Sequence, residues 1–140
     1  SKEIQDLTCE KRYVHEIVAA YVDTWGKDLI GESGYSSIGA VVAPTNSEMI
    51  HNLRAIMPNA YFLVPGYGAQ GGCAEDLANC FNNDGYGAIV NSSRGIIYAY
   101  TRETWKEKYG MKHWEDAVEQ AVITMNKELT DVVRKVREKR

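Results

Sequence analysis

Two short segments of the sequence hold the residues best suited to binding an anion. The first, PGYGAQGG, spans 65–72 and carries Gln70 as an uncharged donor among four glycines, Gly66, Gly68, Gly71 and Gly72. Glycine frees the backbone to turn several N–H groups toward one anion. The second, NSSRG, spans 91–95 and places Arg94 beside hydroxyl groups. Because a guanidinium group matches the geometry of phosphate oxygens, the two segments predict a site for a phosphorylated ligand.

The glycine-rich segment by itself leaves other interpretations open. Residues 66–71 satisfy GxGxxG, the bare string of dinucleotide-binding loops, which is a weak signal alone. No acidic residue ends a following strand, where a ribose contact would be expected, and no GxxxxGK[ST] string is present. A small flavodoxin-like or Rossmann-like protein with another cofactor therefore stays an alternative, as does a tight turn with no ligand.

Other reactive side chains are scattered along the chain. His15, His51 and His113 fall on separate expected helices, which disfavours a shared role as metal ligands or bases. Cys73 follows the glycine-rich segment at an expected helix start, where the helix dipole favours a thiolate, but no histidine lies near it in sequence. We therefore expect neither a metal site nor a nucleophilic cysteine.

Each anion-binding segment follows a short apolar run typical of a buried strand. Strands are expected at 38–43, 61–64 and 88–90, the first buried on both faces because it lacks polar alternation. Helices are expected around them, at 10–25, 45–58, 73–81 and 104–140, with a further one starting near Gly95. Strands that alternate with helices over short connections predict an α/β fold with three parallel strands.

Parallel strands would bring both segments to one edge of the sheet. The carboxyl ends of the strands meet there, and α/β proteins carry their sites at that edge. A helix that starts near Gly95 would add unpaired N–H groups beside Arg94. Two consecutive strand-end turns, one rich in glycine and one with arginine at a helix start, resemble the phosphate cup of many (β/α)8 barrels.

Composition indicates one soluble globular domain. The 140 residues are 44% hydrophobic and 25% charged, and a net charge of −3 offers no broad surface for nucleic acid or an anionic membrane. No apolar run is long enough to span a membrane, and the first residues lack a signal-peptide core. Three cysteines without a CxxC pair favour a reducing, cytoplasmic setting. A start with neither methionine nor a processing signal suggests a piece of a longer chain.

Two longer strings carry a specific resemblance. VVAPTNSEMIHNLRAIMPNAYFLVPGYGAQGG at 41–72, followed by GAIVNSSRGIIYAY at 87–100, resembles the C-terminal half of the orotidine 5′-phosphate decarboxylase family, in its longer bacterial type. The resemblance implies that 1–140 are a single C-terminal half-barrel segment of a (β/α)8 TIM barrel, with about strands 6–8. It further implies conversion of orotidine 5′-monophosphate to uridine 5′-monophosphate and carbon dioxide, without a cofactor.

The same resemblance assigns roles to the two segments. It implies a gripper loop that closes over the substrate, made of Pro65, Gly66, Tyr67, Gly68, Ala69, Gly71 and Gly72. It implies that the substrate phosphate binds Gln70, Ser93, Arg94 and Gly95. Tyr67 stands where the family has a loop-closure residue that is usually smaller. The chain also departs from the family pattern at 43–45, which reads Ala-Pro-Thr, and at Cys73, where an acidic residue is common.

The family's catalytic array is missing from this sequence. The resemblance implies chemistry by a D-x-K-x-x-D motif and a further lysine, yet no such motif occurs, and DTWGKD at 23–28 has the wrong spacing. We expect no catalytic residue in the segment and no decarboxylation by the chain alone. A stand-alone half-barrel that binds phosphorylated nucleotides is an alternative.

The three expected strands would leave two open edges. Such edges are prone to association, so we expect a homodimer, or the missing N-terminal half, to cover them.

Overall fold

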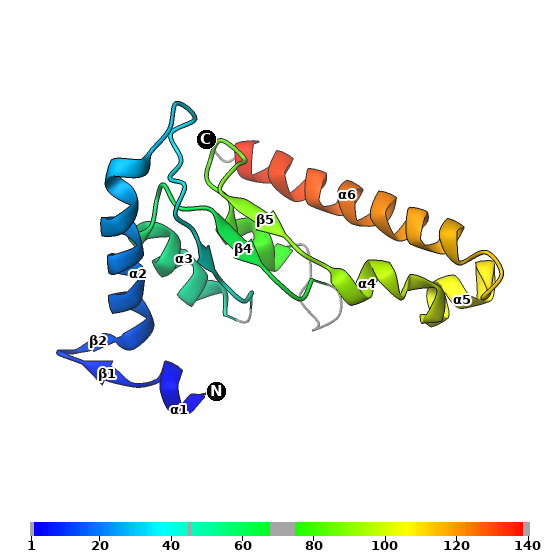
Figure 1. Ribbon diagram of the computed structural model, residues 1–140, viewed down its shortest axis with the longest axis horizontal. Coiled ribbons are helices and arrows are strands. Elements are labelled where there is room, and N and C mark those ends of the chain that lie inside the picture. Colours follow the sequence, from blue (N-terminus) through cyan, green and yellow to red (C-terminus); the bar gives the residue numbers. More distant parts are fainter. Residues whose placement is uncertain (1, 45, 68–74, 139–140) are drawn as a thin grey trace.

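A parallel three-stranded sheet lies at the centre of the computed structural model, which describes residues 2–44, 46–67 and 75–138 (Figure 1). The strands are β3 (Ala40–Val41), β4 (Phe62–Val64) and β5 (Ala88–Val90), in the order β3-β4-β5. The expected parallel α/β arrangement is therefore confirmed. A flavodoxin-like order would place the first strand in the middle, whereas here the second strand is central.

The remaining elements lie beside this sheet or extend away from it. An N-terminal hairpin precedes α2 on one side of the sheet, and α4 and α5 project from the opposite side (Figure 1). Helix α6 then runs back toward the turn ahead of β5, where Arg137 bonds to Asp84 O. Their bounds are α1 (Lys2–Gln5), β1 (Thr8–Cys9), β2 (Arg12–Tyr13), α2 (Val14–Gly26), η1 (Lys27–Leu29), α3 (Ser47–Ile56), η2 (Glu75–Cys80), α4 (Ser93–Ile97), η3 (Ala99–Thr101), α5 (Glu103–Tyr109) and α6 (Trp114–Glu138).

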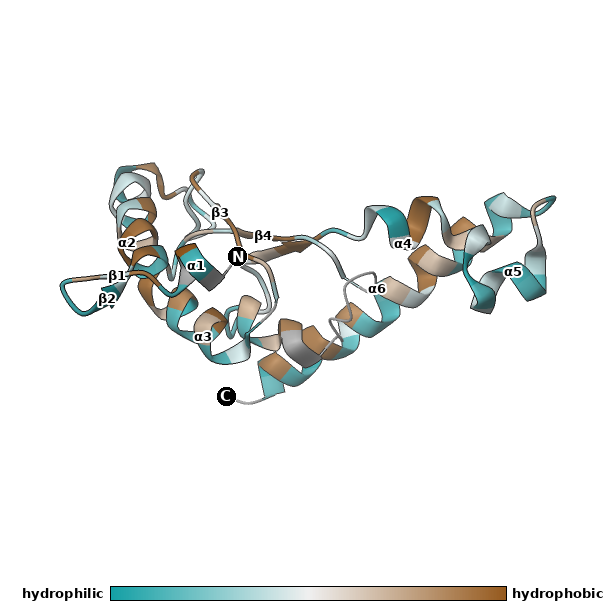
Figure 2. Ribbon diagram, turned by 90° about the horizontal axis from the view of Figure 1, so that it is seen from below, coloured by the Kyte–Doolittle hydropathy of each residue, from teal (hydrophilic) through white to brown (hydrophobic). Residues whose placement is uncertain are grey.

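The two faces of the sheet differ in their cover. Phe62 and Val64 are fully buried on the face toward the helices, and α3 and α6 lie on one side of the strands in Figure 2. On the other face, Val41, Leu63 and Ile89 pair in register and are 71%, 42% and 58% exposed. The expectation that the first strand is buried on both faces is therefore wrong. Successive strand residues alternate between faces, and a single helical layer covers only one of them.

The expected helices form, with corrections at their ends. In α3 the Asn46 side chain accepts a 3.0 Å bond from Met49 N, and Ile50 and Leu53 face the core as the spacing predicts. In α2 the helix ends at Gly26 as expected but begins only at Val14. The turn before it belongs to the β1–β2 hairpin, in which the backbone takes left-handed φ values at Glu10 and Lys11 (51° and 67°).

Two other expected helices are altered. The helix expected at 104–140 is divided into α5 and α6, because Gly110 takes a φ of +62° that a right-handed helix cannot contain. In the segment expected as a helix at 73–81, residues 75–80 form the tighter 3₁₀ helix η2. Leu77 and Cys80 are nevertheless fully buried, so the segment still contributes to the core.

Arg54 is the charged residue at the centre of the packing, and it is only 9% exposed. Its guanidinium carbon lies 3.6 Å from the centroid of the Phe62 ring. Nη1 and Nη2 donate bonds of 2.7–3.0 Å to four carbonyl oxygens, those of Met57, Ala60, Cys80 and Gly87. One side chain thus links the end of α3, the entries to β4 and β5, and the end of η2. Burial lowers the pKa of Arg54 from its ordinary value.

We predict that Arg54→Met lowers the free energy of unfolding by at least about 2 kcal/mol, because buried carbonyl oxygens lose their donors. Urea denaturation measures this change. The matched control is Arg134→Met on α6, where an exposed arginine pairs with Asp131 at 2.8 Å, and a change within about 0.5 kcal/mol is expected there. Equal effects of the two substitutions would contradict the role given to Arg54.

Candidate anion-binding site

The turns that follow β4 and β5 are bonded to each other. The N–H groups of Gly66 and Tyr67 donate to the carbonyl oxygen of Asn91 at 3.1 and 3.3 Å, and Asn91 N donates to Val64 O at 2.8 Å. Gly66 has a φ of +85°, which only glycine adopts without strain. The structure therefore brings together the first three residues of the PGYGAQGG segment and the whole of the NSSRG segment.

Ser92 fastens the two turns a second time. Its buried hydroxyl donates a 2.7 Å bond to the Tyr67 carbonyl oxygen. Gly95 approaches the same hydroxyl so closely that a Cβ added at Gly95 would lie 2.3 Å from Ser92 Oγ. A side chain at position 95 would thus require Ser92 to turn away from Tyr67.

Arg94 stands exposed at the start of α4. The first helical bond runs from Ile96 N to Ser92 O at 3.0 Å, so the N–H groups of Arg94 and Gly95 precede it and have no acceptor within the helix. Within 2–44, 46–67 and 75–138, no carboxylate forms an ion pair with Arg94. Ser93 differs, because its N–H and hydroxyl both donate to Asn91 Oδ1, at 3.1 and 2.8 Å.

Tyr67 faces the helical layer. Its ring is buried in the main core together with Met125, and its hydroxyl donates to the Glu128 carboxylate on α6. The sequence did not predict this contact, because Tyr67 and Glu128 are 61 residues apart and no local pattern links them.

Part of the expected site lies outside the described residues: Gly68, Ala69, Gln70, Gly71 and Gly72, along with Thr45 and Cys73. The described part of the expected site comprises Pro65, Gly66 and Tyr67 after β4 and Ser93, Arg94 and Gly95 at the start of α4. These six residues belong to two turns held together by the bonds to Asn91 and Ser92.

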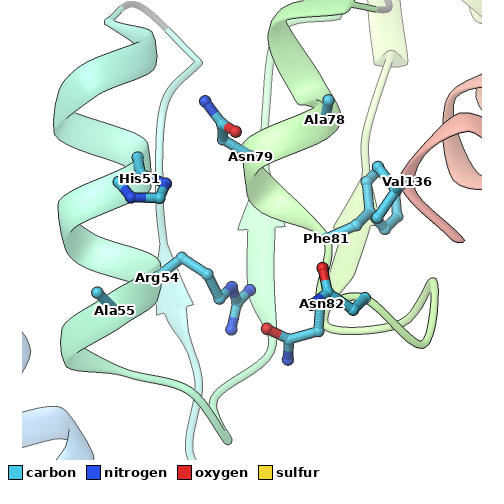
Figure 3. Close-up of a pocket in the computed structure, with 9 residues that line it drawn as sticks. His51, Arg54, Ala55, Ala78, Asn79, Phe81, Asn82 and Val136 are labelled. Carbon is cyan, nitrogen blue, oxygen red and sulfur yellow. The ribbon is translucent and has the colours of Figure 1, made fainter. Parts of the chain in front are cut away.

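A cavity of about 380 Å³ lies between α3, the end of η2 and the end of α6. It is close to the amino ends of β4 and β5, because Arg54 reaches from it to Ala60 O and Gly87 O. Figure 3 shows the lining residues, namely His51, Arg54, Ala55, Ala78, Asn79, Phe81, Asn82, Asn83 and Val136. The cavity is therefore at the opposite end of the sheet from Arg94.

Two titratable groups near this cavity, Cys80 and Tyr35, have pKa values raised by burial. Burial raises the pKa of the Cys80 thiol to about 11. Burial also raises the pKa of Tyr35 to about 12, and the Tyr35 hydroxyl donates to Asp84 at 2.9 Å. Neither group offers a nucleophile at neutral pH.

The three histidines lie on separate parts of the fold. His51 lines the cavity, and His15 stacks on Tyr13 at a ring-centroid distance of 5.2 Å. The Nδ1 atom of His113 lies 3.4 Å from Asp116 Oδ2. Among the described residues, no three histidine, cysteine, aspartate or glutamate side chains are grouped as a metal ion would require. In that same part of the chain, every helix is too short or too polar to span a bilayer.

Comparison with known proteins identifies relatives. No family model matches the sequence. Orotidine 5′-phosphate decarboxylase of Caldicellulosiruptor saccharolyticus is 52% identical over 100 residues, which are 71% of this chain and 33% of that protein. The Clostridium botulinum (strain Langeland) enzyme of the same name is 43% identical over 130 residues, 92% of this chain and 44% of the relative. Over the matched residues the chain is homologous to orotidine 5′-phosphate decarboxylases.

Solved structures agree with this assignment at the level of the fold. An orotidine 5′-monophosphate decarboxylase of Leishmania donovani matches 95% of this chain and 43% of its own length, with a TM-score of 0.68 at 23% identity. A Toxoplasma gondii protein assigned to the same activity matches 98% of this chain and 47% of its own, with a TM-score of 0.76 at 22% identity. The chain spans between a third and a half of the length of these relatives.

We predict that Gly95→Ala lowers the free energy of unfolding by about 1–2 kcal/mol, because Ser92 must rotate and release the Tyr67 carbonyl. In a Ser92→Ala background the obstructing oxygen is gone, so the same substitution is expected to cost nothing. A double-mutant cycle in urea measures the coupling. An equal cost in both backgrounds would contradict the close approach of Gly95 to Ser92.

Proposed function

We propose that this chain is the C-terminal half-barrel segment of an orotidine 5′-phosphate decarboxylase and holds the phosphate of the substrate. In this proposal β3, β4 and β5 correspond to about strands 6–8 of a (β/α)8 barrel, and 1–140 form one segment of it. Support comes from the identity to decarboxylases over up to 92% of the chain and from the joined turns after β4 and β5. The reaction proposed for the full enzyme converts orotidine 5′-monophosphate to uridine 5′-monophosphate (UMP) and carbon dioxide.

The observation that carries the proposal is the exposed Arg94 beside N–H groups that have no acceptor within α4. The Arg94 guanidinium would pair with two phosphate oxygens, and the N–H groups of Arg94 and Gly95 would donate to the same anion. The Ser93 N–H could join them by exchanging Asn91 Oδ1 for phosphate. By resemblance, Gln70 and the gripper loop would close the site from the other side.

The proposal gives these residues a binding role in the reaction. Because the sequence contains no D-x-K-x-x-D array, the groups that act on the substrate carboxylate would be supplied from outside this segment. Binding energy from a remote phosphate can nevertheless serve catalysis, because it offsets the cost of orienting and distorting the reacting part of the substrate. The segment would contribute that energy.

The exposed row of Val41, Leu63 and Ile89 supports a partner for the sheet. In a closed barrel this face would be covered by the strands of the N-terminal half, and the outer edges of β3 and β5 would be paired. A second copy of the chain is the other occupant we propose, which would make the chain a homodimer.

Calorimetric titration with UMP and with uridine tests the phosphate site. We expect the protein to bind UMP more tightly than uridine, and Arg94→Ala to weaken UMP binding at least about tenfold through loss of a charge-assisted contact. Uridine binding should not change in that variant.

The control is Arg134→Ala, which removes an exposed arginine on α6 and should leave UMP affinity unchanged. Equal affinity for UMP and uridine, or a UMP affinity indifferent to Arg94, would contradict the proposed site.

A further inference from the structure

Tyr67 connects the candidate site to the long C-terminal helix. Its side chain follows the turn after β4 and belongs to the same core cluster as Met125, against which Leu129 also packs. Its hydroxyl donates a hydrogen bond to the Glu128 carboxylate. A bond to an ionised acceptor is stronger than one between neutral groups. The carboxylate on α6 therefore restrains where the Tyr67 ring, and with it the Tyr67 backbone, can lie.

The backbone of Tyr67 in turn restrains the NSSRG turn from two directions. Its N–H donates to Asn91 O at 3.3 Å, and its carbonyl oxygen accepts the Ser92 hydroxyl at 2.7 Å. Asn91 also accepts both polar hydrogens of Ser93. Every step from Glu128 to the residues flanking Arg94 is thus a direct hydrogen bond or a covalent connection.

We infer that Glu128 is a positioning residue, which acts through Tyr67 and Ser92 to hold the Arg94 turn in the geometry that receives a phosphate. The inference rests on the proposed function for its ligand and on the described contacts for its mechanism. Glu128 is one turn beyond Met125 on the same helix, so α6 both buries Tyr67 and supplies its acceptor. A residue far from the ligand in sequence would thereby set the affinity of the site.

The test compares Glu128→Gln and Tyr67→Phe with wild type in two measurements on the purified chain. Glu128→Gln keeps the size of the side chain and removes its charge, and Tyr67→Phe removes only the hydroxyl. In ligand-free ¹H–¹⁵N spectra we expect both variants to shift the backbone amides of 91–95. In calorimetry we expect Tyr67→Phe to weaken UMP binding about fivefold, the effect of one lost hydrogen bond. We expect Glu128→Gln to weaken UMP binding as well, because its neutral amide oxygen is a poorer acceptor for the Tyr67 hydroxyl than a carboxylate.

Tyr35→Phe is the matched control, because it deletes another tyrosine hydroxyl bonded to a carboxylate, that of Asp84. This pair lies near the amino ends of the strands, where Tyr35 also accepts a bond from Asn82 at 3.0 Å. We expect a loss of stability in this variant with unchanged amides at 91–95 and unchanged UMP affinity. If the amide shifts and the UMP affinity depended only on the stability of the protein, they would change in all three variants, including Tyr35→Phe.

Each contrary result has a distinct meaning. Unshifted 91–95 amides in Glu128→Gln and Tyr67→Phe would overturn the positioning role, whether or not UMP binds. Shifted amides with unchanged UMP affinity, or an equal loss of affinity in Tyr35→Phe, would overturn it as well. If wild type fails to distinguish UMP from uridine, the proposed function fails, and the amide shifts still decide whether Glu128 positions the turn.

Discussion

The hydrogen bonds of the Arg54 guanidinium to four carbonyl oxygens are the constraint on which the rest of the fold depends. Three of those carbonyls, at Met57, Ala60 and Gly87, belong to connections between the helices and the strands. A lysine could not replace this residue, because its compact ammonium lacks the planar fork that reaches several acceptors at once. The face of the guanidinium also rests on the Phe62 ring, which adds a cation–π contact.

The amino ends and the carboxyl ends of the strands differ in how their neighbouring segments are held. At the amino ends of β4 and β5, the Arg54 bonds and the Tyr35–Asp84 contact bind neighbouring segments tightly. At the carboxyl ends, the turns are joined to each other through Asn91 and Ser92, and Arg94 remains exposed beside N–H groups that have no acceptor within α4. The proposed phosphate site would lie at the carboxyl ends, on turns that the hydrogen bonds already hold in place. Donors that are preorganised in this way need little rearrangement on binding.

The parts of this structure that the sequence predicted are those with local signals. Apolar runs located the three strands, and their parallel arrangement placed the turns after β4 and β5 side by side. The binding of an anion at these turns stays a prediction. Gly110 was a local signal for the end of a helix. The prediction of one helix at 104–140 overlooked it because the helical periodicity continues on both sides. The burial of Arg54 had no such signal, because long charged side chains are mostly exposed. The Tyr67–Glu128 contact likewise depends on tertiary packing. The strand that contains Val41 was expected to be buried on both faces because its residues are apolar. That pattern does not reveal that helices cover only one face of the sheet.

The most direct test of the central claim is an NMR titration of the protein with UMP, followed through its backbone amides. The account predicts that the largest shifts fall on Gly66, Tyr67 and the residues from Asn91 to Gly95, at the carboxyl ends of β4 and β5. Shifts concentrated instead around His51, Asn79 and Asn82, at the cavity beside Arg54, would contradict it.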